Sequence, residues 1–348
     1  LFRTKADEAY QVGRGKSPVD AYLAIDEIIE LAKAKGVDAI HPGYGFLAEN
    51  VEFAKACEDE GIVFIGPDHT MMDNLGDKVK SKIVANKVGV PTIPGMTETI
   101  PSEEVALKFA EDCGYPVMLK AAAGGGGRGM RIVRSREEMP EQFRSAKSEA
   151  KNAFGIDDIF IEKYLERPKH IEVQILGDNY GNIVHLYERD CSIQRRHQKV
   201  VEFTPALSIT EEQRQNICAD AKKIAQAVNY KSAGTVEFLV DHEGNHYFIE
   251  MNPRIQVEHT VTEMTTGIDI VQSQILIAEG YSLDTEKINI KRQDQLQHRG
   301  FSIQCRLTTE DPINCLIHKT YSVEIENESV TAEVPMTAAV ENRVMTRK

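Results

Sequence analysis

The sequence predicts an α/β domain followed by an α+β domain. In the first 77 residues, amphipathic helices alternate with short apolar strands, which is typical of a parallel sheet with crossover helices. From about residue 78 onward, strands are paired across short polar turns, and longer helices stand apart from them. Antiparallel pairs with segregated helices indicate α+β architecture.

The first helix of the α/β part is expected to cover residues 17–36. Ser17 is its N-cap, Pro18 occupies the first helical position and Gly36 ends it. A short strand in residues 37–46 then runs into the loop "HPGYGF", and a second helix and a second strand follow. This helix–strand alternation predicts parallel pairing of the two strands.

The α+β part contains two hairpins and two long helices. The strands "PVMLK" and "MRIVR" flank a glycine-rich segment, and a helix follows them. The first hairpin turns around Asp178 to Gly181, and a helix is expected near residues 210–228. The second hairpin covers "AGTVEFLVDHEGNHYFIEMN", residues 233–252.

Composition excludes several classes of protein. The 348 residues are 41% hydrophobic and 27% charged, as in globular proteins. A net charge of −13 argues against nucleic-acid binding, and no apolar run approaches the ~20 residues of a membrane span. The six cysteines form no CxxC pair and are expected to be reduced thiols of a cytoplasm-like compartment or a mitochondrial matrix.

The second hairpin predicts a cation site. If Asp241 pairs with His246 across the loop "HEGN", Glu237 lies directly opposite Glu250, and Asn252 falls on the same face. Like charges opposite each other destabilise a sheet, and a divalent cation would relieve them. Two carboxylates and an amide oxygen suit Mg²⁺ or Mn²⁺, although two solvated acids are the alternative.

The glycine run at 124–127 predicts a phosphate-binding flap. Lys120 ends the strand that enters this run, and backbone N–H groups without side chains can approach an anion closely. The pattern fits neither the P-loop nor the GxGxxG motif. A plain linker is the alternative interpretation.

Two further segments could contact a nucleotide or a small anion. "IEKYL" at 161–165 follows an apolar strand, and it is either an adenine-binding edge or an ordinary strand-to-helix junction. "CSIQRRHQKVVE" is interpreted as one strand. It would place Arg195, His197 and Lys199 on one face, opposite Gln194, Arg196 and Gln198. A concentrated cationic stripe in an acidic chain favours a site for a small anion.

In this order the motifs resemble the ATP-grasp superfamily, and specifically the biotin carboxylase domain of biotin-dependent carboxylases. The resemblance covers roughly residues 1–312 and rests on "HPGYGFLAEN", "GDKVKSK", "KAAAGGGGRGMR", "ERDCSIQRRHQKVVE", "GTVEFL" and "FIEMNPRIQVEHTVTE". "RPKHIEVQILGDNYGNIVHLYERDCS" and "RGFSIQCRLTTEDP" look most like pyruvate carboxylases. The implied reaction forms carboxyphosphate from ATP and bicarbonate and delivers its CO₂ to a protein-linked biotin.

The resemblance also implies which residues bind ATP. The phosphate contacts would come from Lys78 and Lys120, with Gly126 and Gly127 in the flap. The ribose and adenine region would be held by Glu162, Leu165 and His170. The nucleotide and bicarbonate side would be lined by Gln194, His197 and Lys199.

The implied chemistry uses a metal, an arginine and a carboxylate base. Glu237, Glu250 and Asn252 would carry Mg²⁺ or Mn²⁺, in agreement with the hairpin. Arg254 and the Val257 backbone would hold bicarbonate, and Glu258 would remove its proton, with Lys199 stabilising the anion. Tyr44 would lie near biotin.

The resemblance divides the chain into three parts. These are a partial, Rossmann-like N-terminal domain at 1–77, an ATP-grasp domain with its flap at 78–280, and an incomplete C-terminal domain at 281–348. The chain is expected to be truncated at both ends, because it lacks the family's leading strand and glycine turn, and residues 313–348 do not align. The family's biotin-steadying arginine has no counterpart here, and "VVEFTPAL" departs mildly from the family pattern.

The implied partners are bicarbonate, a biotin carrier domain outside this chain and further copies in a homo-oligomer. The alternative function is a Mg·ATP-binding module that does not complete carboxyl transfer. Another ATP-grasp ligase, such as a carbamoyl-phosphate synthetase, shares an E-x-N-x-R-like end but lacks the "QRRHQK" and "HPGYGF" combination. Localisation is expected to be cytoplasmic, or in the mitochondrial matrix of a eukaryote.

Overall fold

The computed structural model describes residues 5–96, 98–121, 130–154, 157–195, 198–307, 321–325, 328–332 and 341–347. Gly126, Gly127, His197 and the side chain of Lys78 lie outside the described residues. The chain divides into two compact units. Unit 1 comprises Leu1–Gly76, His170–Glu237 and Met251–Lys348, and unit 2 comprises Asp77–Lys169 and Phe238–Glu250.

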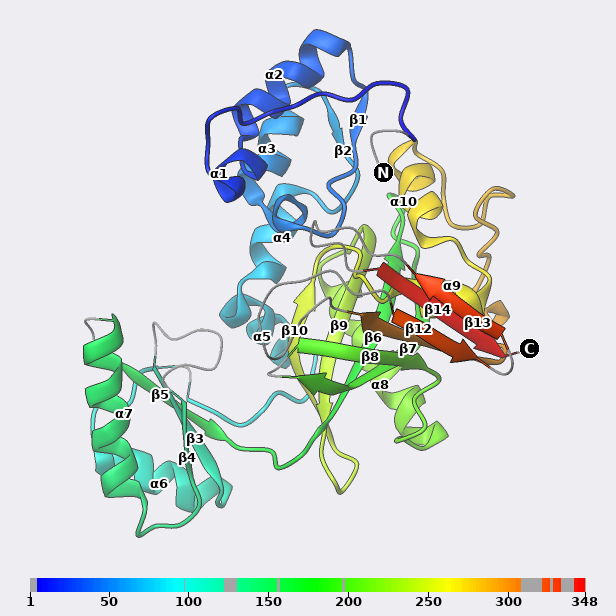
Figure 1. The fold of residues 1–348 in the computed structure, drawn as a ribbon. Helices are drawn as coiled ribbons and strands as arrows, with labels where there is room; N and C mark the ends of the chain where they lie inside the picture. The colour runs from blue at the N-terminus through cyan, green and yellow to red at the C-terminus, as the bar shows by residue number, and fades with distance from the viewer. Residues whose placement is uncertain are drawn as a thin grey trace. The chain divides into compact units, whose positions relative to one another are not determined.

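The N-terminal part of unit 1 is a small α/β layer, as predicted. Strands β1 (Ala39–Ile40) and β2 (Val63–Phe64) pair in parallel, with Ala39 opposite Val63. The surrounding helical elements are α1 (Pro18–Tyr22), α2 (Ile25–Lys35), the short 3₁₀ helix η2 (Phe46–Glu49), α3 (Val51–Asp59) and α4 (His69–Gly76). Figure 1 shows α2 and α3 beside the two strands.

The helix expected over 17–36 is interrupted. Ser17 caps α1 and Gly36 ends α2 in the left-handed conformation, so both predicted ends are confirmed. Between the two helices, the N–H of Ile25 bonds the carbonyl of Leu23, which closes a tight turn at the buried Ala24. Neither Pro nor Gly marks this turn, so helical periodicity alone could not locate it.

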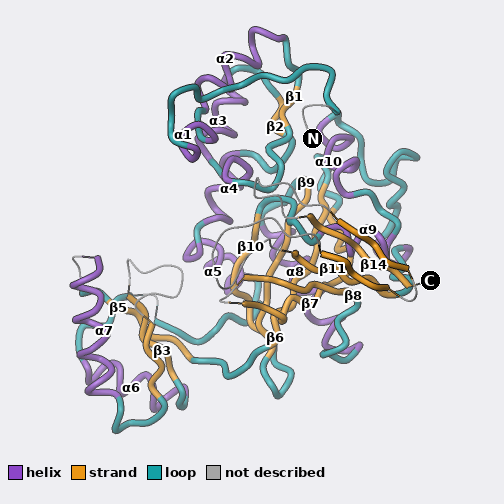
Figure 2. Tube along the Cα trace, viewed as in Figure 1, coloured by secondary structure: helices purple, strands orange, loops and turns teal. Residues whose placement is uncertain are grey.

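A seven-stranded sheet carries most of the functional side chains. Its strand order is β10-β9-β6-β7-β8-β11-β14 (Figure 2). The pairs β6/β7, β7/β8, β8/β11 and β11/β14 are antiparallel, which confirms the α+β prediction. The strands are β6 (Lys169–Gly177), β7 (Ile183–Arg195), β8 (Gln198–Thr204), β9 (Ser232–Val240), β10 (His246–Asn252), β11 (Phe301–Leu307) and β14 (Glu341–Arg347).

Capping residues and the spacing of apolar residues explain the helices of unit 1. Helix α8 (Glu211–Ala227) begins with a capping box between Thr210 and Gln213, close to the predicted helix at 210–228. Leu176, Val184 and Leu186 form a core cluster with buried side chains of α10 (Ile270–Ala278). The other described helical elements here are α9 (His259–Thr266) and η3 (Gln293–Gln295).

Unit 2 is built on a three-stranded antiparallel sheet of order β4-β3-β5. Its strands are β3 (Val117–Ala121), β4 (Met130–Val133) and β5 (Ile159–Lys163), and its helices are α5 (Lys78–Lys87), α6 (Glu103–Cys113) and α7 (Met139–Phe154). Val117, Leu119 and Ile161 are completely or almost completely buried against α6 and α7. Lys120 lies at the end of β3, as the sequence predicts.

The loop of the second hairpin is shorter than predicted. The N–H of Asp241 bonds the carbonyl of Asn245 at 2.9 Å, so these residues close the loop rather than Asp241 and His246. Gly244 has φ +91°, and the Asp241 carboxylate accepts the N–H groups of Glu243 and Asn245, which tightens the turn. The expected four-residue loop is therefore wrong, and the position of Glu250 opposite Glu237 stays a prediction.

The basic run at 191–202 is a hairpin and not one strand. Strand β7 ends at Arg195 and β8 begins at Gln198, and Gln194 pairs with Lys199 across the two strands. Paired residues share a face of a sheet, so Gln194 and Lys199 lie on the same face. The predicted separation of these two residues is therefore wrong, because the strand folds back on itself.

The part of the chain beyond residue 320 adds strands. Besides β14, these are β12 (Tyr321–Ile325) and β13 (Glu328–Ala332), which pair with each other. None of the described helices combines the length and the apolar character needed to cross a membrane. The five described cysteines are free thiols, namely Cys57, Cys113, Cys191, Cys218 and Cys305.

Candidate active site

Lys199 is the centre of a buried ionic cluster in unit 1. Its ammonium lies 2.9 Å from Glu237 Oε1 and 2.7 Å from Glu258 Oε1, and it also contacts Glu172. The three carboxylate side chains are at most 5% exposed, whereas the lysine side chain is 14% exposed. Because charges are costly to bury unless they are paired, this arrangement requires all four groups together.

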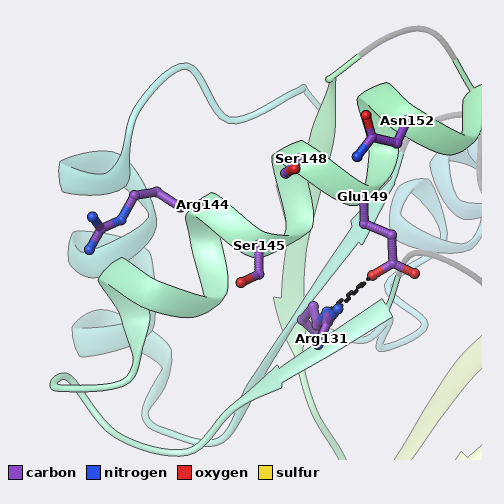
Figure 3. A pocket seen from close by; sticks show the side chains of 6 residues that line it. All are labelled: Arg131, Arg144, Ser145, Ser148, Glu149 and Asn152. Atoms are coloured by element: carbon purple, nitrogen blue, oxygen red, sulfur yellow. Dashed lines mark hydrogen bonds and ion pairs between the residues drawn. The ribbon is translucent and has the colours of Figure 1, made fainter.

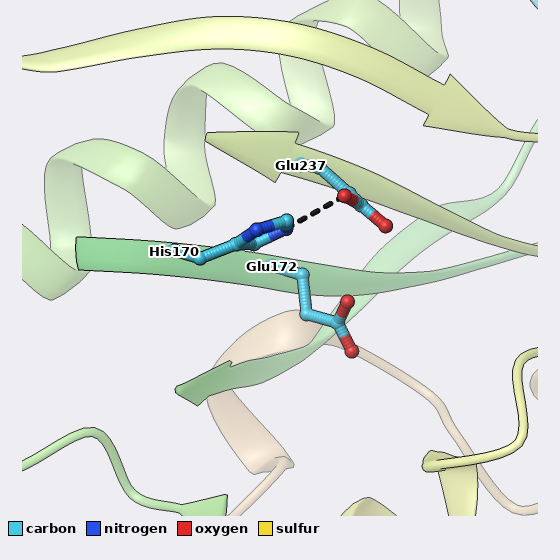
Figure 4. A group of neighbouring side chains, drawn as sticks. All are labelled: His170, Glu172 and Glu237. Atoms are coloured by element: carbon cyan, nitrogen blue, oxygen red, sulfur yellow. Dashed lines mark hydrogen bonds and ion pairs between the residues drawn. The ribbon is translucent and has the colours of Figure 1, made fainter. Parts of the chain in front are cut away.

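Strands β6 and β9 place a histidine beside this cluster. His170 and Glu172 are two residues apart on β6 and share a face, and Glu237 lies on the neighbouring β9 (Figure 4). His170 Nε2 lies 2.6 Å from Glu237 Oε2. Gln194 Nε2 lies 3.0 Å from His170 Nδ1, so Nδ1 accepts from the amide and the Nε2–H points at the carboxylate. The structure thus brings the predicted residues His170, Gln194 and Glu237 together.

Asn252 and Gln256 complete the shell around Glu237. The Nδ2 of Asn252 and the Nε2 of Gln256 donate to Glu237 Oε1 at 2.8 and 2.9 Å. The contact of Asn252 with Glu237 agrees with the prediction that their side chains share a face. Glu250 belongs to unit 2, so its participation remains a prediction.

Arg189 contacts the cluster through Glu172. The sequence interpretation did not single out this arginine. This completely buried guanidinium contacts Glu172 and donates to Gln174 Oε1 at 2.8 Å and Thr262 Oγ1 at 3.0 Å. It also donates to Gln256 Oε1 at 3.3 Å. Arg189 therefore holds one member of the Lys199 cluster, Glu172, and also Gln256, which donates to Glu237.

Glu258 lies between two cations. Lys199 Nζ is 2.7 Å from its Oε1, and the guanidinium of Arg306 donates to its Oε2 at 2.8 Å. Each carboxylate oxygen of the predicted base therefore has its own cationic partner. Sequence reasoning assigned no role to Arg306, although this residue lies within the quoted segment "RGFSIQCRLTTEDP".

Arg254, the predicted bicarbonate ligand, already contacts a carboxylate. Its Nε lies 3.0 Å from Glu49 Oε2, and its NH2 group donates to Asn252 Oδ1 at 3.3 Å. Glu49 is the last residue of η2 and follows the "HPGYGF" loop. An anion that binds Arg254 would compete with Glu49 for the guanidinium.

The pKa values of these groups reflect burial opposed by opposite charge. Burial alone would raise the pKa of Glu237, but Lys199 and His170 hold it well below its usual range. Burial likewise opposes ionisation of Glu258, yet Lys199, Arg189 and Arg306 lower its pKa. Burial would lower the pKa of Lys199, but Glu172 and Glu237 raise it well above its usual range. All three groups are therefore charged at neutral pH.

The residues present fit a hard divalent cation in part. Glu237 and Asn252 supply a carboxylate and an amide oxygen, which are ligand types that Mg²⁺ and Mn²⁺ prefer. The side chains of His170, Glu172 and Glu237 could also hold a metal, but the Lys199 ammonium contacts both carboxylates and neutralises them. Because Glu237 belongs to both sets and contacts the Lys199 ammonium, the same objection applies to each, and the metal ligands stay a prediction.

Unit 2 carries some of the residues predicted to contact ATP. Lys120 and Glu162 form an ion pair on neighbouring strands β3 and β5. The N–H groups of Lys163 and Tyr164 bond the carbonyls of Pro94 and Pro116, so these two donors are used within the fold. Leu165 follows at the end of this segment and is partly buried.

Two predicted residues lie on loops of unit 1. The side chain of Tyr44 is half exposed, and Val257 lies in the turn that precedes α9. Neither position conflicts with a role in binding a small molecule. Their predicted contacts with biotin and bicarbonate stay predictions.

A pocket of about 670 Å³ on unit 2 contains none of the predicted residues (Figure 3). It is lined by α7 and β4, and Arg131 in it pairs with Glu149 at 2.9 Å. Arg144 points away from this ion pair. Arg131 and Glu149 therefore neutralise each other, and we assign no site to this pocket.

Sequence reasoning missed several residues in or near the cluster, namely Glu49, Glu172, Arg189, Gln256 and Arg306. Only Glu172 carried a usable signal, because it follows His170 by two residues on a strand and must share its face. The others meet the cluster through contacts between elements distant in sequence.

Comparison with known proteins places the chain in a family. Residues 1–72 match the family described as "Biotin carboxylase, N-terminal domain", and residues 77–286 match "Carbamoyl-phosphate synthase L chain, ATP binding domain". The biotin carboxylase domain of Hydrogenobacter thermophilus 2-oxoglutarate carboxylase is 46% identical, with a TM-score of 0.82. The match covers 99% of this chain and 78% of that domain. The chain belongs to the biotin carboxylase family.

Curated relatives of this chain include pyruvate carboxylases. The Bacillus subtilis enzyme is 58% identical over 90% of this chain, and the mitochondrial enzyme of Rattus norvegicus is 53% identical over 93%. The chain spans about a quarter (27%) of the length of each. The Hydrogenobacter domain was solved as a dimer with MgADP, ADP and bicarbonate. The predicted resemblance and fold class are therefore confirmed.

Proposed function

We propose that this chain catalyses the ATP- and bicarbonate-dependent carboxylation of biotin on a carrier domain, as part of a pyruvate carboxylase. The observation that most supports this is the buried cluster of unit 1. Lys199, Glu237, Asn252 and Glu258, all selected from the sequence, are linked there by hydrogen bonds and ion pairs. The MgADP and bicarbonate bound to the Hydrogenobacter relative add support.

The proposed first step joins bicarbonate to the γ-phosphoryl group of ATP. Arg254, with the N–H of Val257, would hold the bicarbonate anion after Glu49 is displaced from the guanidinium. Glu258 would accept the bicarbonate proton as an oxygen of bicarbonate attacks the γ-phosphorus and ADP leaves, giving carboxyphosphate. The lowered pKa of Glu258 keeps this carboxylate ionised, so that it can accept a proton. Its two cationic partners, Lys199 and Arg306, limit its basicity.

The remaining residues would bind and orient. Mg²⁺ or Mn²⁺ would neutralise charge on the phosphate oxygens, with Glu237, Asn252 and Glu250 as its proposed ligands. Lys78 and Lys120 would contact phosphates, with Gly126 and Gly127 as a cover that excludes water. Glu162, Leu165, His170, Gln194 and His197 would position the nucleotide, and Tyr44 would contact biotin.

Partners and location follow from the same relatives. A dimer, as in the Hydrogenobacter domain, is the proposed oligomer, and the biotin carrier would come from outside residues 1–348. Free cysteines and the bacterial and mitochondrial relatives support a cytoplasmic or matrix location.

Calorimetry and ADP release test the proposal. We expect Mg·ATP to bind the wild type, and Glu250→Gln to lose the metal-dependent part of that affinity. ADP release that requires bicarbonate and is stimulated by free biotin would support the carboxylase. Binding of Mg·ATP without bicarbonate-dependent release would support the alternative, an ATP-binding module that does not transfer carboxyl groups.

A further inference from the structure

A chain of three side-chain hydrogen bonds holds the loop at 41–46 of unit 1. His41 Nδ1 accepts the N–H of Gly43 at 3.0 Å, and His41 Nε2 lies 3.3 Å from Oε1 of Gln274 on α10. Gln274 Nε2 in turn donates to the hydroxyl oxygen of Ser232 at 3.1 Å. The loop is thus connected to a helix that lies 233 positions further along the chain.

The directions of these hydrogen bonds fix the tautomer of His41. The N–H of Gly43 can only donate, so Nδ1 is the acceptor and the ring proton resides on Nε2. The Nε2–H then donates to the side-chain oxygen of Gln274, whose amide nitrogen donates to Ser232. The other tautomer would set two N–H groups against each other at Gly43. Gln274 therefore selects the form of His41 that holds the loop.

Both ends of this chain of contacts have a left-handed backbone. Gly43 has φ +69°, which a glycine adopts without steric cost. Ser232, the first residue of β9, also has φ +69°, which is uncommon for a residue other than glycine. Such a conformation persists only where the surroundings determine it, and it is concentrated at functional sites. Ser232 and Gln274 are 3% and 2% exposed, so water does not compete for their hydrogen bond.

The other side of the loop packs against α1. A Cβ on Gly45 would lie 2.4 Å from the hydroxyl oxygen of Tyr22, so this tyrosine lies directly against the loop backbone. The rings of Tyr22 and Phe46 meet edge to face, with their centroids 5.8 Å apart. Tyr44 lies between the two anchored glycines and is 50% exposed. The loop therefore presents Tyr44 to solvent from a backbone that is held on both sides.

We propose that His41, held as the Nε2–H tautomer by Gln274, is a positioning residue that fixes the loop carrying Tyr44 for biotin binding. The inference rests on the proposed function, because Tyr44 contacts biotin only in that scheme. His41 itself touches neither biotin nor ATP there. Its loss should therefore weaken biotin binding and leave Mg·ATP affinity unchanged.

Two substitutions separate the hydrogen bonds of His41. His41→Asn places an oxygen where Nδ1 lies, and asparagine side chains readily bond a backbone N–H two residues further on. His41→Gln places an amide where Nε2 lies, so it keeps the contact with Gln274 and loses the bond to Gly43. We expect the KM for free biotin in the ADP-release assay to rise about 10-fold in His41→Gln, the effect of losing one hydrogen bond. His41→Asn should stay close to the wild-type value.

His69→Asn and His69→Gln are the matched controls. His69 lies on α4 in the same layer of unit 1, and its Nδ1 lies 2.6 Å from Glu58 Oε2. Both His69 variants should keep the wild-type KM for biotin. Denaturant unfolding and Mg·ATP calorimetry on all four variants identify a general loss of stability. Equal KM values for His41→Gln and His41→Asn would overturn the proposal.

Gln274→Met tests the selection of the tautomer. Methionine removes the acceptor oxygen and keeps an unbranched side chain, so the KM for biotin should rise. In the His41→Asn background the same substitution should change KM no further, because the asparagine oxygen accepts from Gly43 without Gln274. Additive increases in the double variant would show that Gln274 acts independently of His41 and would overturn its assigned role.

Two readouts without turnover cover failure of the proposed function. If the wild type shows no bicarbonate-dependent ADP release, the proposed function fails, and NMR decides whether His41 fixes the loop. The imidazole ¹⁵N shifts, assigned with His41→Asn, should show the Nε2–H form in the wild type and mixed tautomers in Gln274→Met. Exchange of the Gly43 amide proton should be about 10-fold faster in His41→Gln than in the wild type or His41→Asn. An Nδ1–H form in the wild type, or equal exchange in the three proteins, contradicts the inference.

Discussion

At the scale of single residues, Lys199 decides the electrostatics of the site. Three buried carboxylates converge on its ammonium, and each oxygen of Glu258 has a separate cation. The basic run around Lys199 could be interpreted from the sequence as a cationic stripe for an anion. In the fold its lysine is instead neutralised by acids that lie 27 to 59 positions away in sequence.

Replacing Lys199 by Met should destabilise the protein strongly. The change leaves Glu172, Glu237 and Glu258 buried without their shared cation, and breaking such a buried pair costs about 3–5 kcal/mol. Urea denaturation at neutral pH measures the loss. The matched control is Lys55→Met, because the exposed pair of Lys55 with Asp59 should contribute at most ~1 kcal/mol. Equal unfolding midpoints for the two variants would contradict the proposed role of the cluster.

Glu202 should make stability depend on pH. Burial raises its pKa to about 7, and Arg306 only partly offsets this. Between the unfolded pKa near 4.5 and about pH 7, the unfolded chain releases the Glu202 proton while the folded chain retains it. The free energy of unfolding should therefore fall as pH rises through this window, by about 3 kcal/mol in total.

Glu202→Gln should remove this part of the pH dependence. The variant cannot titrate at this position, so its free energy of unfolding relative to wild type should increase from pH 4.5 to pH 7. Denaturant titrations at several pH values measure the difference. Parallel stability curves for wild type and variant would show that Glu202 does not titrate in this range.

At the scale of elements, short turns place the functional side chains. The β7–β8 hairpin turns between Arg195 and Gln198 and sets Gln194 beside Lys199, which a single strand could not do. The loops 178–182 and 241–245 share the pattern Asp-x-x-Gly-Asn, with a positive φ at each glycine and an aspartate that accepts backbone N–H groups. These loops join the strand pairs that carry His170, Glu172 and Glu237.

Gly177 at the end of β6 should not tolerate a side chain. A Cβ there would lie 2.1 Å from the backbone oxygen of the buried Tyr230. Gly177→Ala should destabilise by about 1–3 kcal/mol through overpacking, measured by denaturant unfolding. Gly76→Ala, in the last turn of α4 with nothing within 4 Å, is the control and should be neutral or slightly stabilising. Equal stability of the two variants would mean that the Tyr230 backbone yields easily.

At the scale of the whole molecule, the two compact units do not follow chain order. The predicted division at 77/78 and 280/281 is sequential, whereas unit 1 collects three separate stretches of the chain. Lys120 and Glu162 belong to unit 2, and Glu237 and Asn252 belong to unit 1. The predicted domain boundaries at 77/78 and 280/281 remain predictions.

Mg·ATP should stabilise the folded protein as a whole. A ligand that binds only the native state adds about 2.7 kcal/mol at 100 times its Kd, so Tm should rise with Mg·ATP concentration. Differential scanning fluorimetry with ATP, Mg²⁺, both and neither separates the contributions. Glu237→Gln should abolish the extra shift that Mg²⁺ gives in the presence of ATP. An identical shift in this variant would remove Glu237 from the proposed metal ligands.

The sequence by itself determined the family, the fold class and a set of residues that the structure groups in unit 1. Local signals were sufficient for the capped start of α1, the glycine end of α2 and the approximate span of α8, and for the parallel and antiparallel pairing. Local signals failed at Leu23–Ala24, at the β7–β8 turn and at the closing pair of the second hairpin, where one residue changes the register. Arg189, Glu202 and Arg306 became visible only in the tertiary structure. Their partners are distant in sequence, and a buried charge reveals its role only through the opposite charge packed against it.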